Sequence, residues 1–150
     1  ETASIISLRL VVEVRSRYKL MEVNIWPLDS LTQEEMWQHY PNLTWQWSNE
    51  ASTAVMLGGE SVLQVQKRTW DTKEEINGIH PEDNVVAVNH SFTIAGLLCK
   101  LLWMPLLDFQ RLRLNLVNIT LVEVIQASIT LVYYNDQCHR EDLEEDGERA

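Results

Sequence analysis

Apolar positions along this chain of 150 residues follow two spacings, which predict alternating helices and strands. Residues 85–88 are β-branched and apolar on both faces, and residues 10–14 are apolar apart from Glu13, so we expect a buried strand at 85–88 and a mostly buried one at 10–14. Residues 119–124 and 129–134 form two further apolar runs, and their separation predicts a hairpin. Helices alternating with strands are typical of the α/β class.

Two capping boxes mark where helices begin. Thr32 can accept a hydrogen bond from the amide of Glu35, whose carboxylate can return one, and Ser61 and Gln64 form a second such pair. The spacing predicts that the first helix ends near residue 40, before a proline, and the second near residue 77, before a glycine. We expect residues 48–60 to form a loop.

A strand–turn–helix unit is the most informative local feature. The strand at residues 85–88 leads through Asn89, His90 and Ser91 into a leucine-rich helix at residues 93–103. Ligands of open α/β sheets bind beyond the carboxyl ends of strands, where the amides of the next helix attract phosphate. His90 is therefore the strongest candidate among the four histidines, and we expect structural or surface roles for the others, which are His39, His80 and His139.

The amino-acid composition excludes some classes of binding partner, but it says little about which reaction the protein could catalyse. The 45% hydrophobic content excludes wholesale disorder, and 22 acidic against 12 basic residues argue against a nucleic-acid surface. No apolar run is long enough to predict a membrane span, and no signal-peptide pattern appears, so we expect a cytoplasmic protein. Half of the net charge of −10 lies in residues 135–150. Residues 140–150 thus read as a solvated acidic tail, or as a docking tail.

Several common kinds of site have no support. The nucleophile elbow of serine hydrolases, the glycine-rich nucleotide loops and the helical zinc motif are all missing from the sequence. Cys99 reads as a small core residue. We expect the tryptophans at 45, 47, 70 and 103 to pack in the core. We expect no metal and no cofactor.

Three segments, taken in order, resemble the histidine phosphatase superfamily, whose members are phosphoglycerate-mutase-like. The first bears a candidate acid, the second is a glycine-rich loop with the helix behind it, and the third contains His90. Their sequences are Leu20-Met21-Glu22 with Leu31-Thr32 and Tyr40-Pro41; Gly58-Gly59-Glu60-Ser61 with Val65, Gln66 and Arg68; and Val85-Val86-Ala87-Val88-Asn89-His90 with Trp103-Met104-Pro105-Leu106.

The resemblance implies a three-layer α/β/α sheet and a two-step phosphoryl transfer through a phosphohistidine, without a metal. His90 would be the second, phosphate-holding histidine, and Glu22 would give a proton to the leaving oxygen. The backbone amides of Ser91 and Phe92 would face the phosphate. The implied substrate is a small phosphorylated molecule, taken by a phosphomonoester hydrolase or a mutase.

The sequence also departs from the superfamily pattern. No Arg-His-Gly triplet, which carries the nucleophile in the superfamily, occurs in these residues, and Ser91 and Phe92 replace the usual glycines. Trp26-Pro27-Leu28-Asp29-Ser30 replaces the usual Gly-x-Trp-Glu-Gly after the acid.

Because the chain opens at Glu1 within a predicted helix, we expect residues 1–139 to be the C-terminal portion of a larger domain. That domain would have its first strand–helix–strand portion and its nucleophile outside this chain. The alternatives are a catalytically inactive binding or scaffold protein, and an unrelated α/β interaction module that works through the acidic tail.

Overall fold

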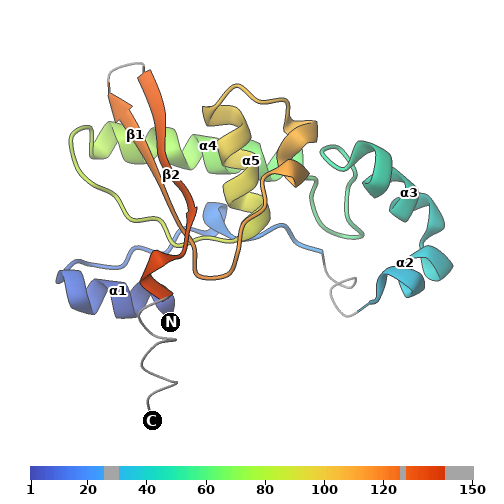
Figure 1. Ribbon diagram of the computed structural model, residues 1–150. Coiled ribbons are helices and arrows are strands. Elements are labelled where there is room, and N and C mark those ends of the chain that lie inside the picture. Colours follow the sequence, from blue (N-terminus) through green and yellow to red (C-terminus); the bar gives the residue numbers. More distant parts are fainter. Residues whose placement is uncertain (26–30, 126–127, 141–150) are drawn as a thin grey trace, which may run out of the picture.

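The computed structural model describes residues 1–25, 31–125 and 128–140 (Figure 1). The segment at 26–30, the middle of the predicted hairpin turn and residues 141–150 of the predicted tail lie outside the described residues. The elements in chain order are α1 (Thr2–Leu10), η1 (Tyr18–Leu20), α2 (Gln33–His39), α3 (Pro41–Glu50), α4 (Val62–Ile79), α5 (Ser91–Leu101), η3 (Leu106–Arg111), β1 (Ile119–Ile125) and β2 (Ser128–Asp136).

The long helix α4 and the shorter α5 form the centre of the molecule (Figure 1). They pack against each other, η3 packs against α5, and η1 packs on α4. The β1–β2 ribbon passes beside this pair, α1 lies at the end where the chain begins, and α2 and α3 form an arm on the opposite side. The mixed helix-and-sheet class predicted from the sequence is confirmed.

Both predicted capping boxes are present. The Thr32 hydroxyl accepts the amide of Glu35 at 3.2 Å, and the Glu35 carboxylate accepts the amide of Thr32 at 2.7 Å. Ser61 and Gln64 make the same exchange at the start of α4. The loop predicted at 48–60 is partly wrong, since α3 begins at Pro41 and continues to Glu50. Proline suits the first turn of a helix, where its missing donor is not needed.

The two predicted buried strands are the main correction. Residues 10–14 comprise the last residue of α1, its left-handed C-cap Val11 and three residues outside any helix or strand, and residues 85–88 also have no strand pairing. Within the described residues the sheet is two-stranded and antiparallel, with Val124 opposite Ile129. A strand exists only where a neighbour accepts its backbone hydrogen bonds, and neither segment has one there. The β-branched composition therefore predicted two buried strands at places where the described structure has neither strand pairing nor burial.

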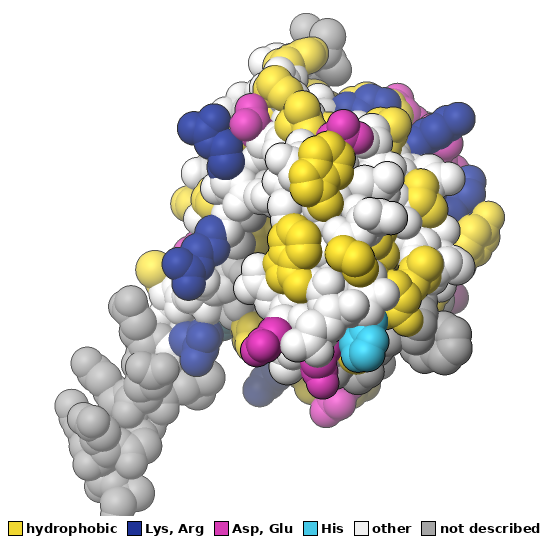
Figure 2. Space-filling model, turned by 90° about the vertical axis from the view of Figure 1, so that its right-hand side faces the viewer, with side chains coloured by type: hydrophobic (Ala, Val, Ile, Leu, Met, Phe, Trp, Pro, Cys, Tyr) yellow, Lys and Arg dark blue, Asp and Glu magenta, His cyan; other side chains and the backbone are white. Residues whose placement is uncertain are grey.

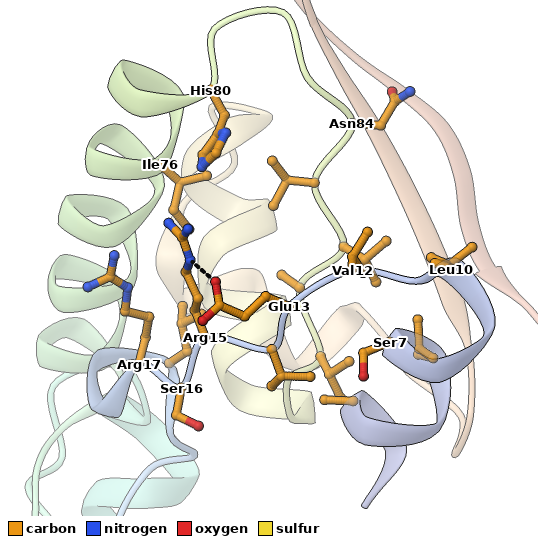
Figure 3. Close-up of a pocket in the computed structure, with 18 of the residues that line it drawn as sticks. Ser7, Leu10, Val12, Glu13, Arg15, Ser16, Arg17, Ile76, His80 and Asn84 are labelled. Atoms are coloured by element: carbon orange, nitrogen blue, oxygen red, sulfur yellow. Dashed lines mark hydrogen bonds and ion pairs between the residues drawn. The ribbon is translucent and has the colours of Figure 1, made fainter.

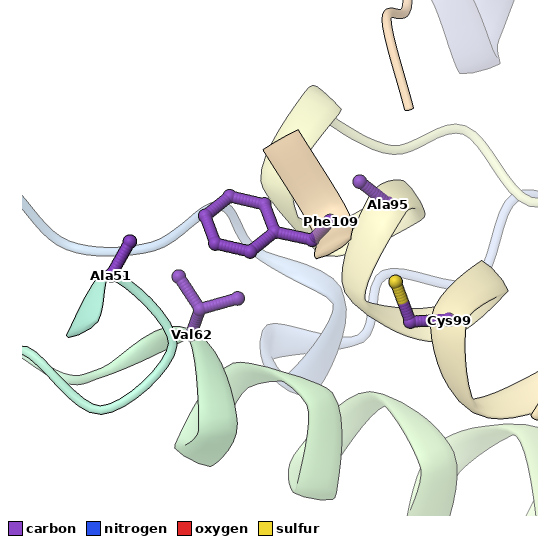
Figure 4. Packing of buried hydrophobic residues seen from close by; sticks show 5 residues of the cluster. All are labelled: Ala51, Val62, Ala95, Cys99 and Phe109. Atoms are coloured by element: carbon purple, nitrogen blue, oxygen red, sulfur yellow. The ribbon is translucent and has the colours of Figure 1, made fainter. Parts of the chain in front are cut away.

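Phe109 from η3 is the centre of the core (Figure 4). It packs with Ala51, Val62, Ala95 and Cys99, and all five are buried. The core placement predicted for Cys99 is confirmed, and burial raises the pKa of its thiol above the ordinary value. A neutral thiol is a poor nucleophile, so Cys99 is a packing residue.

The tryptophans divide between the core and the surface. Trp47 packs edge-on against Phe92 and Phe109, with ring centroids 5.7 and 6.0 Å away. Trp45 and Trp103 are instead 54% and 76% exposed, so core packing is wrong for these two. Figure 2 shows hydrophobic side chains scattered among polar ones on the face of the molecule that α2 and α3 occupy.

Replacing Ser61 with alanine should lower the free energy of unfolding by about 1–2 kcal/mol, because it removes the cap of α4. Urea denaturation followed by circular dichroism measures the change. Ser16→Ala is the matched control, since Ser16 is exposed and caps no helix. An equal loss in both variants would contradict the capping role.

Candidate functional site

The carboxylate of Glu22 is bound to the start of α5. It accepts hydrogen bonds from the amide of Phe92 at 3.0 Å and from the amide of Thr93 at 3.1 Å. It also accepts the amide of its neighbour Val23 at 2.9 Å. The residue at the N-cap of α5, His90, makes no side-chain capping bond. Glu22 therefore caps α5 from a segment about 70 residues earlier in the chain, where the helix dipole stabilises a negative charge.

Thr93 joins the acid-bearing segment to α5 a second time. Its hydroxyl is fully buried and lies 3.0 Å from both the carboxylate of Glu22 and the backbone carbonyl of Met21. Thr93 thus holds the side chain and the backbone of this segment together. The sequence alone did not single out Thr93. Its position three residues after His90, at the third amide of the helix, is the signal that would have found it.

Arg68 in α4 fixes the same segment from the opposite side. Its guanidinium donates to the backbone carbonyls of Lys19 at 2.6 Å and Glu22 at 3.3 Å. Two more of its N–H groups bind the carboxylate of Glu60 at 2.6 and 3.0 Å. The side chains of Arg68 and Glu60 are 18% and 24% exposed, so solvent screens this bidentate pair only in part. Arg68 and Glu60 belong to one predicted motif, and their task is to position the segment that bears Glu22.

The two glycines before Glu60 are each required by the backbone. Gly58 has a φ of +66°, in the left-handed region. Gly59 passes so close to the backbone carbonyl of Asn24 that any side chain there would clash with it. The glycine loop therefore lies directly against the acid-bearing segment. The structure thus brings together two motifs that the sequence presents as separate.

His90 and Ser91 lie at the exposed side of this junction. His90 has an extended backbone, and its amide donates to the side chain of Asn89 at 2.8 Å. His90 also lines a hollow of about 700 Å³ between α1, the extended residues 12–17 and the end of α4 (Figure 3). Ser91 is exposed at the first position of α5. The amide of Phe92, expected to face a phosphate, donates to Glu22 instead.

The remaining histidines lie elsewhere. His39 ends α2, His139 follows β2, and His80 pairs with Asp83 at 2.8 Å beyond the end of α4. In the part of the chain that the structure describes, no three His, Cys, Asp or Glu side chains are placed to hold a metal ion. None of the described helices is long and apolar enough to cross a membrane.

The chain matches the histidine phosphatase superfamily (branch 1) over residues 1–137, and it therefore belongs to that superfamily. Phosphoserine phosphatase 1 of Hydrogenobacter thermophilus is 23% identical over 128 residues, which are 85% of this chain and 61% of that protein. The chain thus spans less than two thirds of the length of this relative.

Solved structures show the same fold. YhfR of Bacillus stearothermophilus gives a TM-score of 0.81 at 20% identity, over 92% of this chain and 69% of that one. The α-ribazole phosphatase of Shigella flexneri gives 0.78 at 18% identity, over 90% and 67%. Mycobacterial glucosyl-3-phosphoglycerate phosphatase with VO3 gives 0.75 at 26% identity, over 91% and 71%. The phosphoglycerate-mutase-like fold predicted from the motifs is confirmed.

Thr93→Val should release Glu22 from α5 in part, because valine keeps the shape of threonine but lacks its hydroxyl. We expect a loss of about 1–3 kcal/mol in the free energy of unfolding, since the carbonyl of Met21 loses a buried partner. We also expect faster hydrogen exchange at the amide of residue 93.

Thr93→Ser is the matched control for this prediction, because it retains the hydroxyl and should keep the slow exchange. Equal exchange in the valine and serine variants would show that the hydroxyl does not hold Glu22.

Proposed function

We propose that this chain is the C-terminal portion of a phosphomonoester hydrolase that works through a phosphohistidine, with the nucleophile on polypeptide outside these 150 residues. The observation that supports this most directly is the convergence of Glu22 and His90 on the first turn of α5. An acid, a second histidine and a helix N-terminus at one place are the groups that this chemistry needs beside its nucleophile.

In this proposal His90 holds the oxygens of the phosphate, and Ser91 offers the first amide of α5. Glu22 gives a proton to the leaving oxygen. The Glu22 carboxylate accepts four hydrogen bonds, so before it donates it must take up a proton and exchange one of these bonds for a bond to the leaving oxygen. No step of this reaction requires a metal ion, because imidazole and fixed amides stabilise the phosphoryl oxygens.

We infer a small phosphorylated substrate. The relatives whose names state an activity include phosphatases for phosphoserine, for glucosyl-3-phosphoglycerate and an α-ribazole phosphatase, which all point to small phosphorylated molecules. Because these relatives are named as phosphatases, we propose hydrolysis rather than the mutase reaction.

The second candidate is a catalytically inactive binding or scaffold protein with the same fold. The hydrogen bonds that the Glu22 carboxylate accepts from the amides of α5 favour this candidate, since a carboxylate that caps a helix has a structural role without any chemistry. Reading the gene upstream of Glu1 separates the two candidates. An Arg-His-Gly triplet there supports the hydrolase, and its absence leaves the inactive protein.

His90→Ala should weaken the binding of inorganic phosphate to the 150-residue chain at least severalfold, because the imidazole supplies a donor at the phosphate. Chemical-shift changes at the amides of the first turn of α5 measure this binding. His39→Ala is the control, because His39 lies at the end of α2. Unchanged phosphate binding in His90→Ala would remove this residue from the proposed site.

Glu22→Gln should lower the hydrolysis rate far more for alkyl phosphates than for aryl phosphates, when measured in a protein that also carries the nucleophile. An alkoxide leaves poorly without a proton, whereas a phenolate leaves readily. The glutamine oxygen can still accept one amide of α5, so the helix cap is partly kept. Equal losses for both substrate types would contradict proton donation by Glu22.

A further inference from the structure

Trp103 is an exposed tryptophan at a position where helices commonly place glycine. It follows α5 with a φ of +53°, in the left-handed region, and it is 76% exposed. The amide of Met104 donates to the carbonyl of Cys99 at 2.8 Å and the amide of Trp103 to the carbonyl of Lys100 at 3.4 Å, which is the Schellman arrangement. Glycine would adopt this backbone without strain, so packing within the chain does not explain the tryptophan. A strained, exposed aromatic residue instead indicates a contact with another molecule.

Trp103 begins a short row of exposed apolar residues. Two residues of this loop, Met104 and Leu106, pack against the core cluster around Phe109. The residues that alternate with them are exposed, and we call them the tryptophan stripe: Trp103, Pro105 and Leu107, the last at 61%. The inward residues anchor the loop, so the outward ones keep fixed positions. Tryptophan on an anchored backbone is typical of the strongest contacts in protein interfaces.

The part of the chain around the stripe is basic, although the whole chain is acidic. Residues 84–122 contain three basic side chains, Lys100, Arg111 and Arg113, and one acidic side chain, Asp108. The side chain of Arg111 is 77% exposed, and its ion pair with Asp108 at 3.4 Å is weak in solvent. Lys100 is also exposed, and no carboxylate of the described residues pairs with it. These cations favour an acidic ligand that carries an apolar side chain.

The sequence itself contains a segment of that chemistry. Residues 141–150 have six acidic side chains and one basic side chain, and their leucine, Leu143, has an acid on each side. Leu143 comes three residues after Arg140, so it lies within about 11 Å of it. Figure 1 shows the described residues after β2 on the side of the molecule where α1 lies, and the loop after α5 at the opposite end. Leu143 therefore meets the stripe of another copy more readily than its own.

We propose that the tryptophan stripe binds residues 141–150 of a second copy of this chain. Leu143 packs against the stripe, and the acidic side chains around it pair with Lys100 and Arg111. The two contacting surfaces differ, so each copy can bind one partner through its stripe and another through its acidic segment. This inference does not depend on the proposed hydrolase, because neither surface includes a residue of the candidate site.

Trp103→Gly tests the stripe and keeps the fold. Sedimentation velocity of the 150-residue chain over a concentration series measures association. We expect the unchanged chain to associate and Trp103→Gly to raise the dissociation constant at least about tenfold. In dilute, dissociated protein the same variant should unfold at a higher urea concentration, because glycine relieves the backbone strain. Trp45→Ala is the matched control and should associate normally, since Trp45 is 54% exposed in α3 and lies outside the stripe.

A labelled peptide of residues 140–150 tests the acidic segment directly. Fluorescence anisotropy should show that it binds the dilute chain, and that a serine in place of Leu143 weakens binding at least about tenfold. Raising NaCl to about 300 mM should weaken binding severalfold, because exposed ion pairs are screened by salt. Lys100→Gln should do the same, and Lys67→Gln is its matched control, since Lys67 is exposed in α4 outside residues 84–122.

Four results would overturn the proposal. They are no association of the unchanged chain, equal association of Trp103→Gly, equal association of Leu143→Ser, and a peptide that binds Trp103→Gly as tightly as the unchanged chain. Peptide binding that appears only after residues 141–150 are deleted, at every protein concentration, would assign the stripe to the acidic segment of the same chain and would equally overturn it.

Discussion

The carboxylate of Glu22 at the amino end of α5 is the interaction on which the arrangement of the site depends. An uncapped helix end would leave the amides of residues 92 and 93 without partners in a half-buried place, and Glu22 satisfies both. In return, α5 fixes the direction in which Glu22 points. The helix and the acid therefore define each other's position, and His90, one residue before α5, is placed by the same contact.

The rest of the chain supports this contact from three sides. Thr93 holds the segment from α5, Arg68 from α4, and Gly59 from the loop between α3 and α4. Thr93 and Arg68 hydrogen-bond to backbone carbonyls of this segment, and Gly59 lies against the carbonyl of Asn24. Residues 19–24 have no helix or strand of their own beyond η1. A segment without regular structure keeps a single conformation when its carbonyls and amides have fixed partners elsewhere. The glycine loop and the segment that bears Glu22 therefore form one structural unit.

Local signals in the sequence predicted the helices well. Each signal involves residues that are close together in the sequence. These signals are the capping boxes at Thr32 and Ser61 and the leucine spacing before Pro105, and the structure contains the helix that each predicts. Pairing of strands is different, because it depends on a partner elsewhere in space. Residues 10–14 and 85–88 have the composition of strands, yet they stay unpaired among the described residues.

The candidate site could be predicted only in part, because some of its contacts also join residues that are distant in the sequence. His90 follows an extended segment and precedes a helix, so its place could be inferred locally, and Glu22 came from the family resemblance. The role of Thr93 and the contact between Arg68 and residues 19–22 join positions 46 to 72 apart in the sequence. No local pattern reports contacts over such separations.

The same separations set an order of events during folding. The hydrogen bonds of the helices join neighbouring residues, whereas the bond between Glu22 and Thr93 closes a loop with its ends 71 positions apart. Closing a long loop costs chain entropy before any contact compensates for it. We therefore expect the acid to reach its place late, after α4 and α5 have packed. A partly folded chain would contain its helices and still lack its site.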